Sequence, residues 1–353
     1  MMPGLPLQKS RTDAFLEVLE RESIALFQQI KQATVSGPWD ASPVEDKYLP
    51  LREALLAIPG FLRGFRHTFL AAGRHNFPDS PGKQVFLDWG GCVPLGLKWK
   101  GARHLWKMAR TLYRHRPFRL ADLDSPLIGE PSTYRVPRSL SVTLAEIVRR
   151  LRRKGPLASD RYCHITEAQI RYLYYRHQIR EAVGDSLGTI LEVGGGFGGL
   201  ATDLLHHCEV KRFFLVELPD TLPLAYFYLR ASFEVPVQCL FHAGDRMDPN
   251  ARIVVLAPWM LPQLQAELDL LINTMSFQHM MSESVRFYLE QADRLNTRVL
   301  YLVNRDTQRD PTDLVISKYP IPSAYTLVSK RQWLFGSVPE IIYKRQSRDA
   351  RAR

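Results

Sequence analysis

The sequence has few cysteines, no long hydrophobic run and no apolar segment at its N-terminus. Its four cysteines are widely spaced and form no C-x-x-C pair, so neither a zinc site nor a disulfide framework is indicated. Scattered thiols fit a reducing cytoplasm. No stretch reaches the roughly 18 to 20 apolar residues that a membrane-spanning helix needs. Residues 1–11 lack the apolar core of a secretory signal. We therefore expect a cytoplasmic protein.

Positive charge is concentrated in the N-terminal part of the chain. Residues 1–157 contain 25 Lys and Arg against 14 Asp and Glu, whereas residues 158–353 contain 22 of each, so the first part carries the whole net charge of +11. Two runs dominate: Lys98 to Arg119, which has no acidic residue, and Arg149 to Lys154. One interpretation is a solvated basic face. The other is attraction to an anionic partner, namely a phosphorylated acceptor, a membrane surface or a nucleic acid.

The pattern of apolar residues changes near residue 157 and predicts two domains. Residues 1–157 read as a basic, mainly helical domain, with helices over 12–33 and 51–72 and an irregular stretch over 77–94. Residues 158–346 alternate short apolar runs with helical segments, which predicts an α/β fold with a parallel sheet. Residues 347–353 form a basic tail. The predicted strands are 189–193, 212–218, 269–274, 298–303, 324–329 and 340–343, and the predicted helices are 166–183, 197–207, 221–233 and 283–295.

A glycine-rich turn follows the first of these strands and opens the next helix. It reads EVGGGFGG over residues 192–199. Glycines let a backbone turn tightly and approach a ligand closely. Gly194, Gly196 and Gly199 satisfy the GxGxxG pattern of dinucleotide-binding folds. Gly194, Gly196 and Gly198, preceded by Glu192, also give the ExGxGxG pattern of class I methyltransferases, which bind S-adenosylmethionine (SAM).

Two acidic residues distinguish these ligand classes. Glu217 lies 21 residues after Gly196, at the end of the next strand, where a carboxylate can accept hydrogen bonds from ribose hydroxyls. Leu218 follows it and is grouped with it as a cofactor-binding residue. Glu192 beside the glycines suits a cationic ligand and is unfavourable next to a pyrophosphate. SAM carries a sulfonium and an ammonium group, so the pair favours SAM over a dinucleotide.

The later segments of the second domain support the same interpretation. A mostly parallel sheet that ends in an antiparallel pair is the usual ending of the class I methyltransferase fold. Ligands of open α/β sheets bind beyond the carboxyl ends of the strands, so Asn273, Thr274 and Ser276 should lie near the transferred methyl group. Either 235–240 or 252–257 is the third strand. The first choice allows Asp245 to reach the adenine ring, and the second places Trp259 better to pack on it.

Five segments resemble a family of sugar O-methyltransferases within the class I SAM-dependent superfamily. The resemblance covers roughly residues 160–345, and its more specific parts are the E-L-P after the second strand and the N-T-M-S-F-Q-x-M turn. It implies a Rossmann-like fold and SAM-dependent methylation of a sugar hydroxyl in polysaccharide, glycolipid or glycosylated-metabolite biosynthesis. His279 departs from the family pattern, which usually has Glu there. The segments are ILEVGGGFGGL at 190–200, FLVELPDTL at 214–222, APW at 257–259, NTMSFQHM at 273–280 and YLVNR at 301–305.

Candidate catalytic residues come from the turn after residue 274. His279 is the first candidate for a base, because histidine titrates near neutral pH, and Asn273 and Ser276 are grouped with it. Gln278 and Ser276 are candidates for holding the acceptor sugar. No metal-binding pattern is present. Three other functions stay open: a nucleic-acid methyltransferase, an NAD-dependent oxidoreductase and a non-catalytic binding module.

The basic N-terminal domain has several roles open to it. The acceptor is expected to contain a sugar and to be free, phosphate-linked or lipid-linked. The domain would bind this acceptor, contact a membrane surface peripherally, or form a homo-oligomer, and all three roles stay open.

Overall fold

The computed structural model describes the C-terminal part of the chain almost continuously and the N-terminal part in pieces. The described residues are 5, 12–34, 36–38, 55–57, 62, 107–118, 122, 134–137, 162–165, 167–308 and 314–346. The predicted stretch at 77–94, the basic run at 149–154 and the tail lie outside them, as do most of the predicted helix at 51–72 and part of the run at 98–119. Within the described part, no helix is long and apolar enough to cross a membrane.

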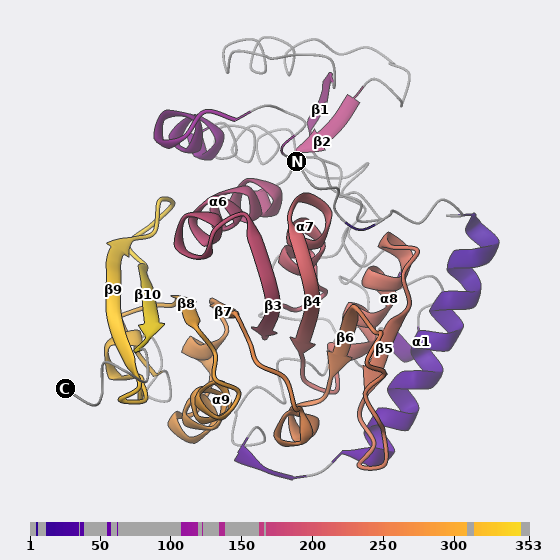
Figure 1. Cartoon of the computed structure of the whole chain (residues 1–353). Coiled ribbons are helices and arrows are strands. Elements are labelled where there is room, and N and C mark those ends of the chain that lie inside the picture. The colour runs from indigo at the N-terminus through magenta and orange to yellow at the C-terminus, as the bar shows by residue number, and fades with distance from the viewer. Residues whose placement is uncertain are drawn as a thin grey trace.

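An eight-stranded sheet forms the centre of the molecule (Figure 1). Its strand order is β5-β6-β4-β3-β7-β8-β10-β9, with parallel pairing from β5 to β8 and antiparallel pairing of β10 with both β8 and β9. The predicted mostly parallel sheet with an antiparallel ending is therefore confirmed. The bounds are β3 Ser186–Val193, β4 Glu209–Val216, β5 Val237–Leu240, β6 Ile253–Leu256, β7 Leu270–Thr274, β8 Val299–Val303, β9 Tyr325–Gln332 and β10 Pro339–Arg345.

Both candidates for the third strand are strands. β6 pairs with β4, so it is the strand that continues the sheet next to the one that carries Glu217. β5 pairs only with β6 within the described residues and lies at the edge of the sheet. The sequence could not separate the two because both are short apolar runs of similar length.

The helices agree with the sequence pattern, and their ends have local causes. Thr12 caps the first helix, its hydroxyl accepting a hydrogen bond from the Phe15 N–H at 3.2 Å. Gly184 ends the helix before β3 with a φ of +106° and donates its N–H to the Arg180 carbonyl. The helices are α1 Asp13–Ala33, α6 Glu167–Val183, α7 Gly199–His207, α8 Leu222–Ser232 and α9 Ser282–Arg294, with 3₁₀ turns η6 Pro258–Gln263, η7 Phe277–His279 and η8 Ile316–Lys318.

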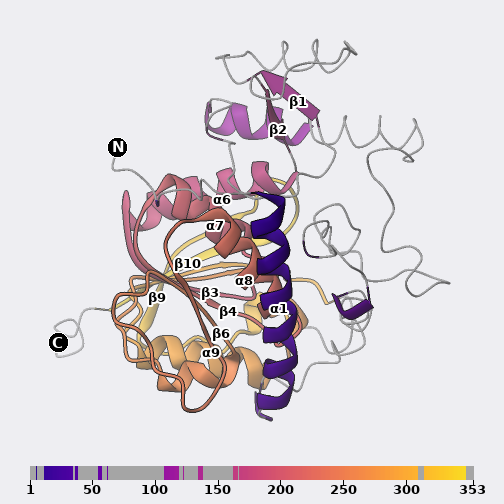
Figure 2. The same cartoon turned by 90° about the vertical axis from the view of Figure 1, so that its right-hand side faces the viewer.

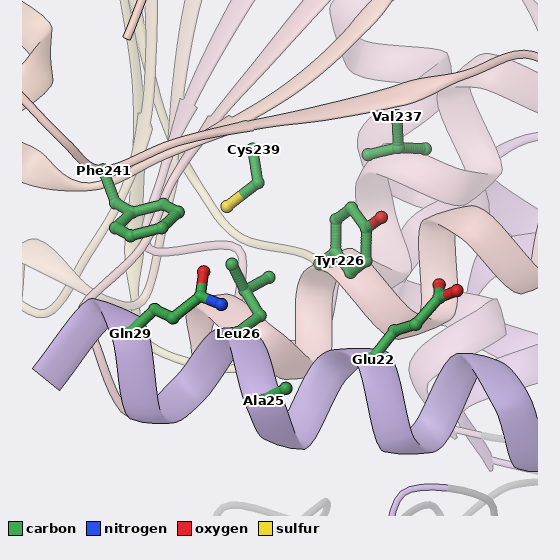
Figure 3. Close-up of a pocket in the computed structure, with 8 residues that line it drawn as sticks. All are labelled: Glu22, Ala25, Leu26, Gln29, Tyr226, Val237, Cys239 and Phe241. Carbon is green, nitrogen blue, oxygen red and sulfur yellow. The ribbon is translucent and has the colours of Figure 1, made fainter. Parts of the chain in front are cut away.

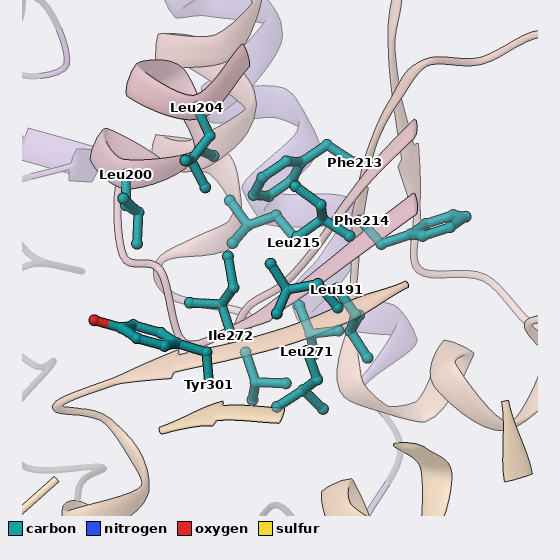
Figure 4. Packing of buried hydrophobic residues seen from close by; sticks show 14 of the residues in the cluster. Leu191, Leu200, Leu204, Phe213, Phe214, Leu215, Leu271, Ile272 and Tyr301 are labelled. Atoms are coloured by element: carbon teal, nitrogen blue, oxygen red, sulfur yellow. The ribbon is translucent and has the colours of Figure 1, made fainter. Parts of the chain in front are cut away.

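The core contains apolar side chains from the central strands and from the helices packed against them; Figure 4 shows the part formed with α7. All residues of β6 and β8 are buried, as parallel strands covered on both faces require. Leu200 and Leu204 of α7 pack over Leu215 and Ile272. This packing fixes the position at which the glycine turn enters α7.

Described parts of the N-terminal region pack directly against the C-terminal part. Leu19 and Phe27 of α1 share a buried cluster with Phe227 and Tyr228 of α8. Strand β1 (Tyr134–Pro137) pairs antiparallel with β2 (Tyr162–Ile165), so a two-stranded sheet crosses the predicted boundary at residue 157. α1 belongs physically to the sheet domain, and Figure 2 shows it lying along one side of that domain. The boundary between the two predicted domains itself stays a prediction.

Candidate active site

The glycine turn lies at the carboxyl end of β3 and faces two different environments. Gly194 has a φ of +72°, and a Cβ there would collide with the Ser276 side chain from the turn after β7. Gly196 has a φ of +65°, and a Cβ there would meet nothing within 4 Å. The first glycine therefore lets two turns approach each other. The second borders open space at the N-terminal end of α7, where backbone N–H groups and the helix dipole point outward.

Glu217 lies beside this turn, directly after β4, and is buried. Its Oε1 accepts a hydrogen bond from the Gly196 N–H. Its Oε2 accepts one from the Thr221 hydroxyl at 2.5 Å and one from the Leu218 N–H at 3.2 Å. Burial raises the pKa of this carboxyl to about 7, although these hydrogen bonds lower it. Glu217 thus holds the glycine turn and offers a carboxylate at the position where the sequence predicted a ribose ligand.

Glu192 is the second buried carboxyl of the site. Its side chain lies under the glycine turn, because a Cβ on Gly195 would come within 2.7 Å of its Oε2. That Oε2 has no hydrogen-bond partner. Burial, and after it the nearby Glu217, raise the pKa of Glu192 to about 8. A buried polar atom without a partner costs free energy and marks a place that a ligand can complete.

The electrostatics of this pair favour a positively charged ligand. Within the described residues, no Lys, Arg or His forms an ion pair with Glu192 or Glu217. Two neighbouring buried carboxyls repel each other when both are ionised. A cation placed beside them would favour ionisation of both, whereas a phosphate would oppose it. The site therefore fits a cationic cofactor better than a pyrophosphate.

The turn after β7 is attached to the glycine turn through Asn273 and Ser276. The Asn273 amide donates to the Val193 carbonyl at 2.9 Å and to the Ser276 hydroxyl at 2.5 Å, and Ser276 itself donates to Val193 O at 3.0 Å. Met275 between them has a φ of +64°, a conformation that is uncommon and costly for a residue with a side chain. The turn therefore has a fixed and strained shape.

Asn273 is fully buried, and its amide oxygen also accepts from the Phe277 N–H and the Asn304 amide. Its hydrogen-bonding capacity is thus used inside the protein. Contact between Asn273 and a substrate, which the sequence suggested, has no support in this geometry; the residue holds the turn in place.

Asn304 belongs to the 301–305 segment of the resemblance, but the sequence analysis assigned it no role in the site. It follows β8, is fully buried, and donates its amide to the Asn273 Oδ1 at 2.9 Å while accepting from the Gln278 N–H at 3.2 Å. It therefore connects the turn after β7 to the end of β8. The available signal was its position, because like Asn273 it is a polar residue at the carboxyl end of an apolar parallel strand.

Gln278 and His279 have different surroundings. Gln278 is buried, and its Oε1 accepts a hydrogen bond from the Arg305 N–H at 2.9 Å, so its oxygen is used structurally. His279 is exposed at the end of η7, with its Nε2 3.3 Å from the Gln278 amide nitrogen. Of the candidates on this turn, His279 has the side chain most accessible to an acceptor.

Asp245 and Trp259 lie on one side of the site, around Phe241. The Asp245 carboxylate accepts hydrogen bonds from the N–H groups of Phe241 and His242, both at 2.8 Å. The Trp259 indole N–H donates to the Phe241 carbonyl at 2.6 Å. Trp259 follows β6, the neighbour of β4, so it is the better placed of the two for a ring bound next to Leu218. The contact of either residue with a cofactor stays a prediction.

A separate cavity of about 440 Å³ lies on the outer side of Phe241 (Figure 3). It is formed between α1 and the edge strand β5, and Val237 and Cys239 of the strand and Phe241, which follows it, line the cavity. It contains none of the glycine-turn residues. Within the described residues, no group of three or more His, Cys, Asp or Glu could hold a metal ion.

The chain was compared with protein families, curated proteins and solved structures. No family model matches the chain, and no curated protein matches it either. Among solved structures it is similar to the pyocyanin biosynthetic protein PhzM (TM-score 0.37, 10% identity, 50% of this chain and 57% of that one). It is also similar to the small RNA methyltransferase HEN1, with a TM-score of 0.37 and 14% identity over 55% of this chain and 27% of that one. A third similar structure is an O-methyltransferase family protein from Burkholderia thailandensis, with a TM-score of 0.35 and 13% identity over 51% of this chain and 59% of that one.

The chain has a Rossmann-like class I methyltransferase fold, which its strand order and the antiparallel pairing of β10 with β8 and β9 establish. The similarity concerns the fold, and the chain spans about half the length of two of these proteins and a smaller part of HEN1. The narrower resemblance to sugar O-methyltransferases is not supported by a family match.

Proposed function

We propose that this protein is a SAM-dependent methyltransferase. The observation that carries the proposal is the pair of buried carboxyls beneath the glycine turn: one has an oxygen that lacks a partner, and neither forms an ion pair with a cation of the described residues. Glu217 would hold the ribose hydroxyls, and Glu192 would favour the positive end of the cofactor. The open space at Gly196 would admit the ligand against the backbone.

The same observation opposes an NAD-dependent oxidoreductase. A dinucleotide would bring its pyrophosphate to the glycine turn, close to Glu192 and Glu217. Repulsion between two negative groups in a poorly solvated site is strong. The antiparallel ending of the sheet is also the ending of the methyltransferase fold.

The chain's residues define how an acceptor would be held. When bound, SAM supplies an electrophilic methyl group on a cationic sulfur. The turn from Met275 to His279 is attached rigidly to the glycine turn, so it fixes the direction from which an acceptor oxygen approaches. Good orientation is worth roughly 7–11 kcal/mol in such a reaction. His279, exposed on this turn, is the residue we assign to accept the hydroxyl proton.

We further propose a sugar hydroxyl as the acceptor, in the biosynthesis of a polysaccharide, glycolipid or glycosylated metabolite. This rests on the resemblance of the E-L-P segment and the 273–280 turn to sugar O-methyltransferases. A phosphate-linked acceptor agrees with the basic N-terminal region.

A nucleic-acid methyltransferase is the second candidate. The helical residues 107–115 bury Met108 and Leu112 and expose Lys107, Arg110 and Arg114 on the other side. An exposed basic face on a helix attracts phosphate groups regardless of their source. The two candidates share the cofactor and differ in the acceptor.

Calorimetric titration of the full chain with SAM, S-adenosylhomocysteine (SAH) and NAD tests the cofactor. We expect micromolar binding of SAM and SAH, no binding of NAD, and loss of binding in Glu217→Ala. Asp248→Ala, an exposed carboxylate in the loop between β5 and β6, is the control and should bind normally. Binding of NAD alone, or of none of the three, would overturn the proposal.

Methyl transfer from labelled SAM then identifies the acceptor class. Sugars, nucleotide-linked sugars and glycolipids form one panel, and RNA and DNA form the other. Methylation of a nucleic acid, with binding that falls steeply as salt rises, would replace the sugar proposal while leaving the cofactor proposal intact.

A further inference from the structure

α1 reaches the candidate site at its C-terminal end. It packs along α8, and its last turn and the following residues extend to the carboxyl side of the sheet (Figures 1 and 2). Two contacts attach this part of the chain to the sheet domain. Both contacts involve segments that follow carboxyl ends of strands.

The first contact joins Lys31 to Asp220. The Lys31 ammonium lies 3.4 Å from the Asp220 Oδ1, and the Asp220 side chain is 7% exposed while that of Lys31 is 38% exposed. Asp220 lies in the turn after β4, next to Thr221, whose hydroxyl donates to Glu217. The last turn of α1 is therefore attached to the same short turn that holds the proposed ribose ligand.

The second contact joins Pro38 to Ser284. The Ser284 hydroxyl donates to the Pro38 carbonyl at 2.5 Å, and Ser284 is buried in the first turn of α9. α9 begins just after the turn that carries Ser276 and His279. The other end of the segment is thus attached beside the proposed acceptor side of the site.

Strand order determines what lies between the two contacts. β4 and β7 are the two neighbours of β3, so a segment attached after β4 and again after β7 passes the carboxyl end of β3. The glycine turn is at that end. Neighbouring strands are about 4.8 Å apart, so the strand ends are about 10 Å apart, and seven residues reach at most about 25 Å. The segment is long enough to pass over the turn.

We propose that Lys31 and Ser284 are positioning residues that hold the described residues after α1, 34 and 36–38, across the glycine turn as a cover of the cofactor site. The inference rests on the proposed function. Cofactor entry and release then require this cover to move, and the ion pair and the hydrogen bond resist that movement. The cofactor affinity of the sheet domain would depend on a helix from the N-terminal region.

The closing experiment measures release of SAH from the full chain by stopped-flow fluorescence, with affinities from calorimetry. We expect Lys31→Glu to raise the SAH dissociation rate by about 3- to 10-fold, the size of effect that a partly exposed ion pair supports. Lys31→Arg keeps the charge and should restore the rate. Ser284→Ala should raise it by a similar factor. Arg21→Glu, an exposed charge reversal earlier on α1, is the matched control and should leave it unchanged.

A double-mutant cycle distinguishes positioning from general destabilisation. Lys31→Ala and Asp220→Asn should not add in their effects on the SAH dissociation rate, because they interrupt the same ion pair. Hydrogen exchange of residues 32–34, 36 and 37 should slow when SAH binds, whereas that of residues 13–20 should not.

The inference is overturned if Lys31→Glu and Arg21→Glu release SAH at the same rate, if the cycle is additive, or if SAH does not protect the segment. These outcomes differ from failure of the proposed function, in which the unmodified chain binds neither SAM nor SAH.

Discussion

Replacement of Glu192 by Gln gives the sharpest test of the electrostatic reasoning. The carboxyl is buried beneath the glycine turn, its Oε2 has no partner, and its pKa is raised from 4.5 to about 8, first by burial and then by Glu217. Between pH 4.5 and about pH 8, the Glu192 carboxyl is ionised in the unfolded chain and protonated in the folded chain. The folded state therefore binds more protons, and its stability falls as pH rises through this window.

The size of the effect follows from the two pKa values. Each pH unit of difference is worth about 1.4 kcal/mol, so ionising Glu192 costs the folded state on the order of 5 kcal/mol at pH 9 relative to pH 4. The Glu192→Gln variant has no carboxyl to ionise at this position, so it does not lose stability from this ionisation as pH rises. Glu217, whose pKa is raised to about 7, contributes in the same direction and is present in both proteins. The difference between the two stability curves therefore reports the ionisation of Glu192 together with its coupling to Glu217.

Urea denaturation from pH 5 to pH 9 measures that difference. We expect the stability of Glu192→Gln relative to the unmodified protein to rise by several kcal/mol between pH 5 and pH 9. Parallel curves would refute the assignment of a buried, protonated carboxyl. A linked measurement concerns the cofactor: at pH 7, SAM binding should release a proton from Glu192, so its apparent enthalpy should differ between phosphate and Tris buffers. Glu192→Gln should abolish the part of that difference that comes from this proton.

Three further predictions concern the turns around the site. Asn304→Leu leaves the Asn273 oxygen and the Gln278 N–H without one partner each and should lower the free energy of unfolding by about 2–4 kcal/mol in urea titrations at pH 7. Gly194→Ala should destabilise the fold more than Gly196→Ala, because only the first Cβ meets a side chain; thermal unfolding measures the order, and equal losses would contradict it. His279→Ala should lower kcat about 10²- to 10⁴-fold without changing SAH affinity, and an unchanged rate would remove His279 as the base.

Local features of the sequence were sufficient to predict the sheet. Apolar runs of four to eight residues gave the strands, and a left-handed glycine ends α6 where it was expected. The absence of a helix between the last two strands predicted their antiparallel pairing. The third strand stayed open between two candidates because two equivalent apolar runs follow each other, and only pairing with β4 shows which one adjoins it.

The composition of the candidate site was predictable, but the role of each residue was not. Gln278 and Asn273 are polar residues at a strand end, which is typical of substrate contacts. The Asn273 amide is used inside the protein, whereas only the oxygen of Gln278 is bound by Arg305 and its amide nitrogen lies beside His279, so a substrate role of Gln278 stays a prediction. Which polar group faces the ligand and which faces the protein depends on side-chain packing that no periodicity records.

The sequence alone determined the elements, their order and the glycine turn with its two acids, because each depends on residues close together in the chain. Tertiary structure decided the burial that raises the pKa of Glu192, since that depends on the strands and turns packed around it. It also decided the contact of Lys31 with Asp220 and of Pro38 with Ser284, which join residues far apart in the sequence. Such contacts form only in the folded protein, where the strand order sets the distances between the turns.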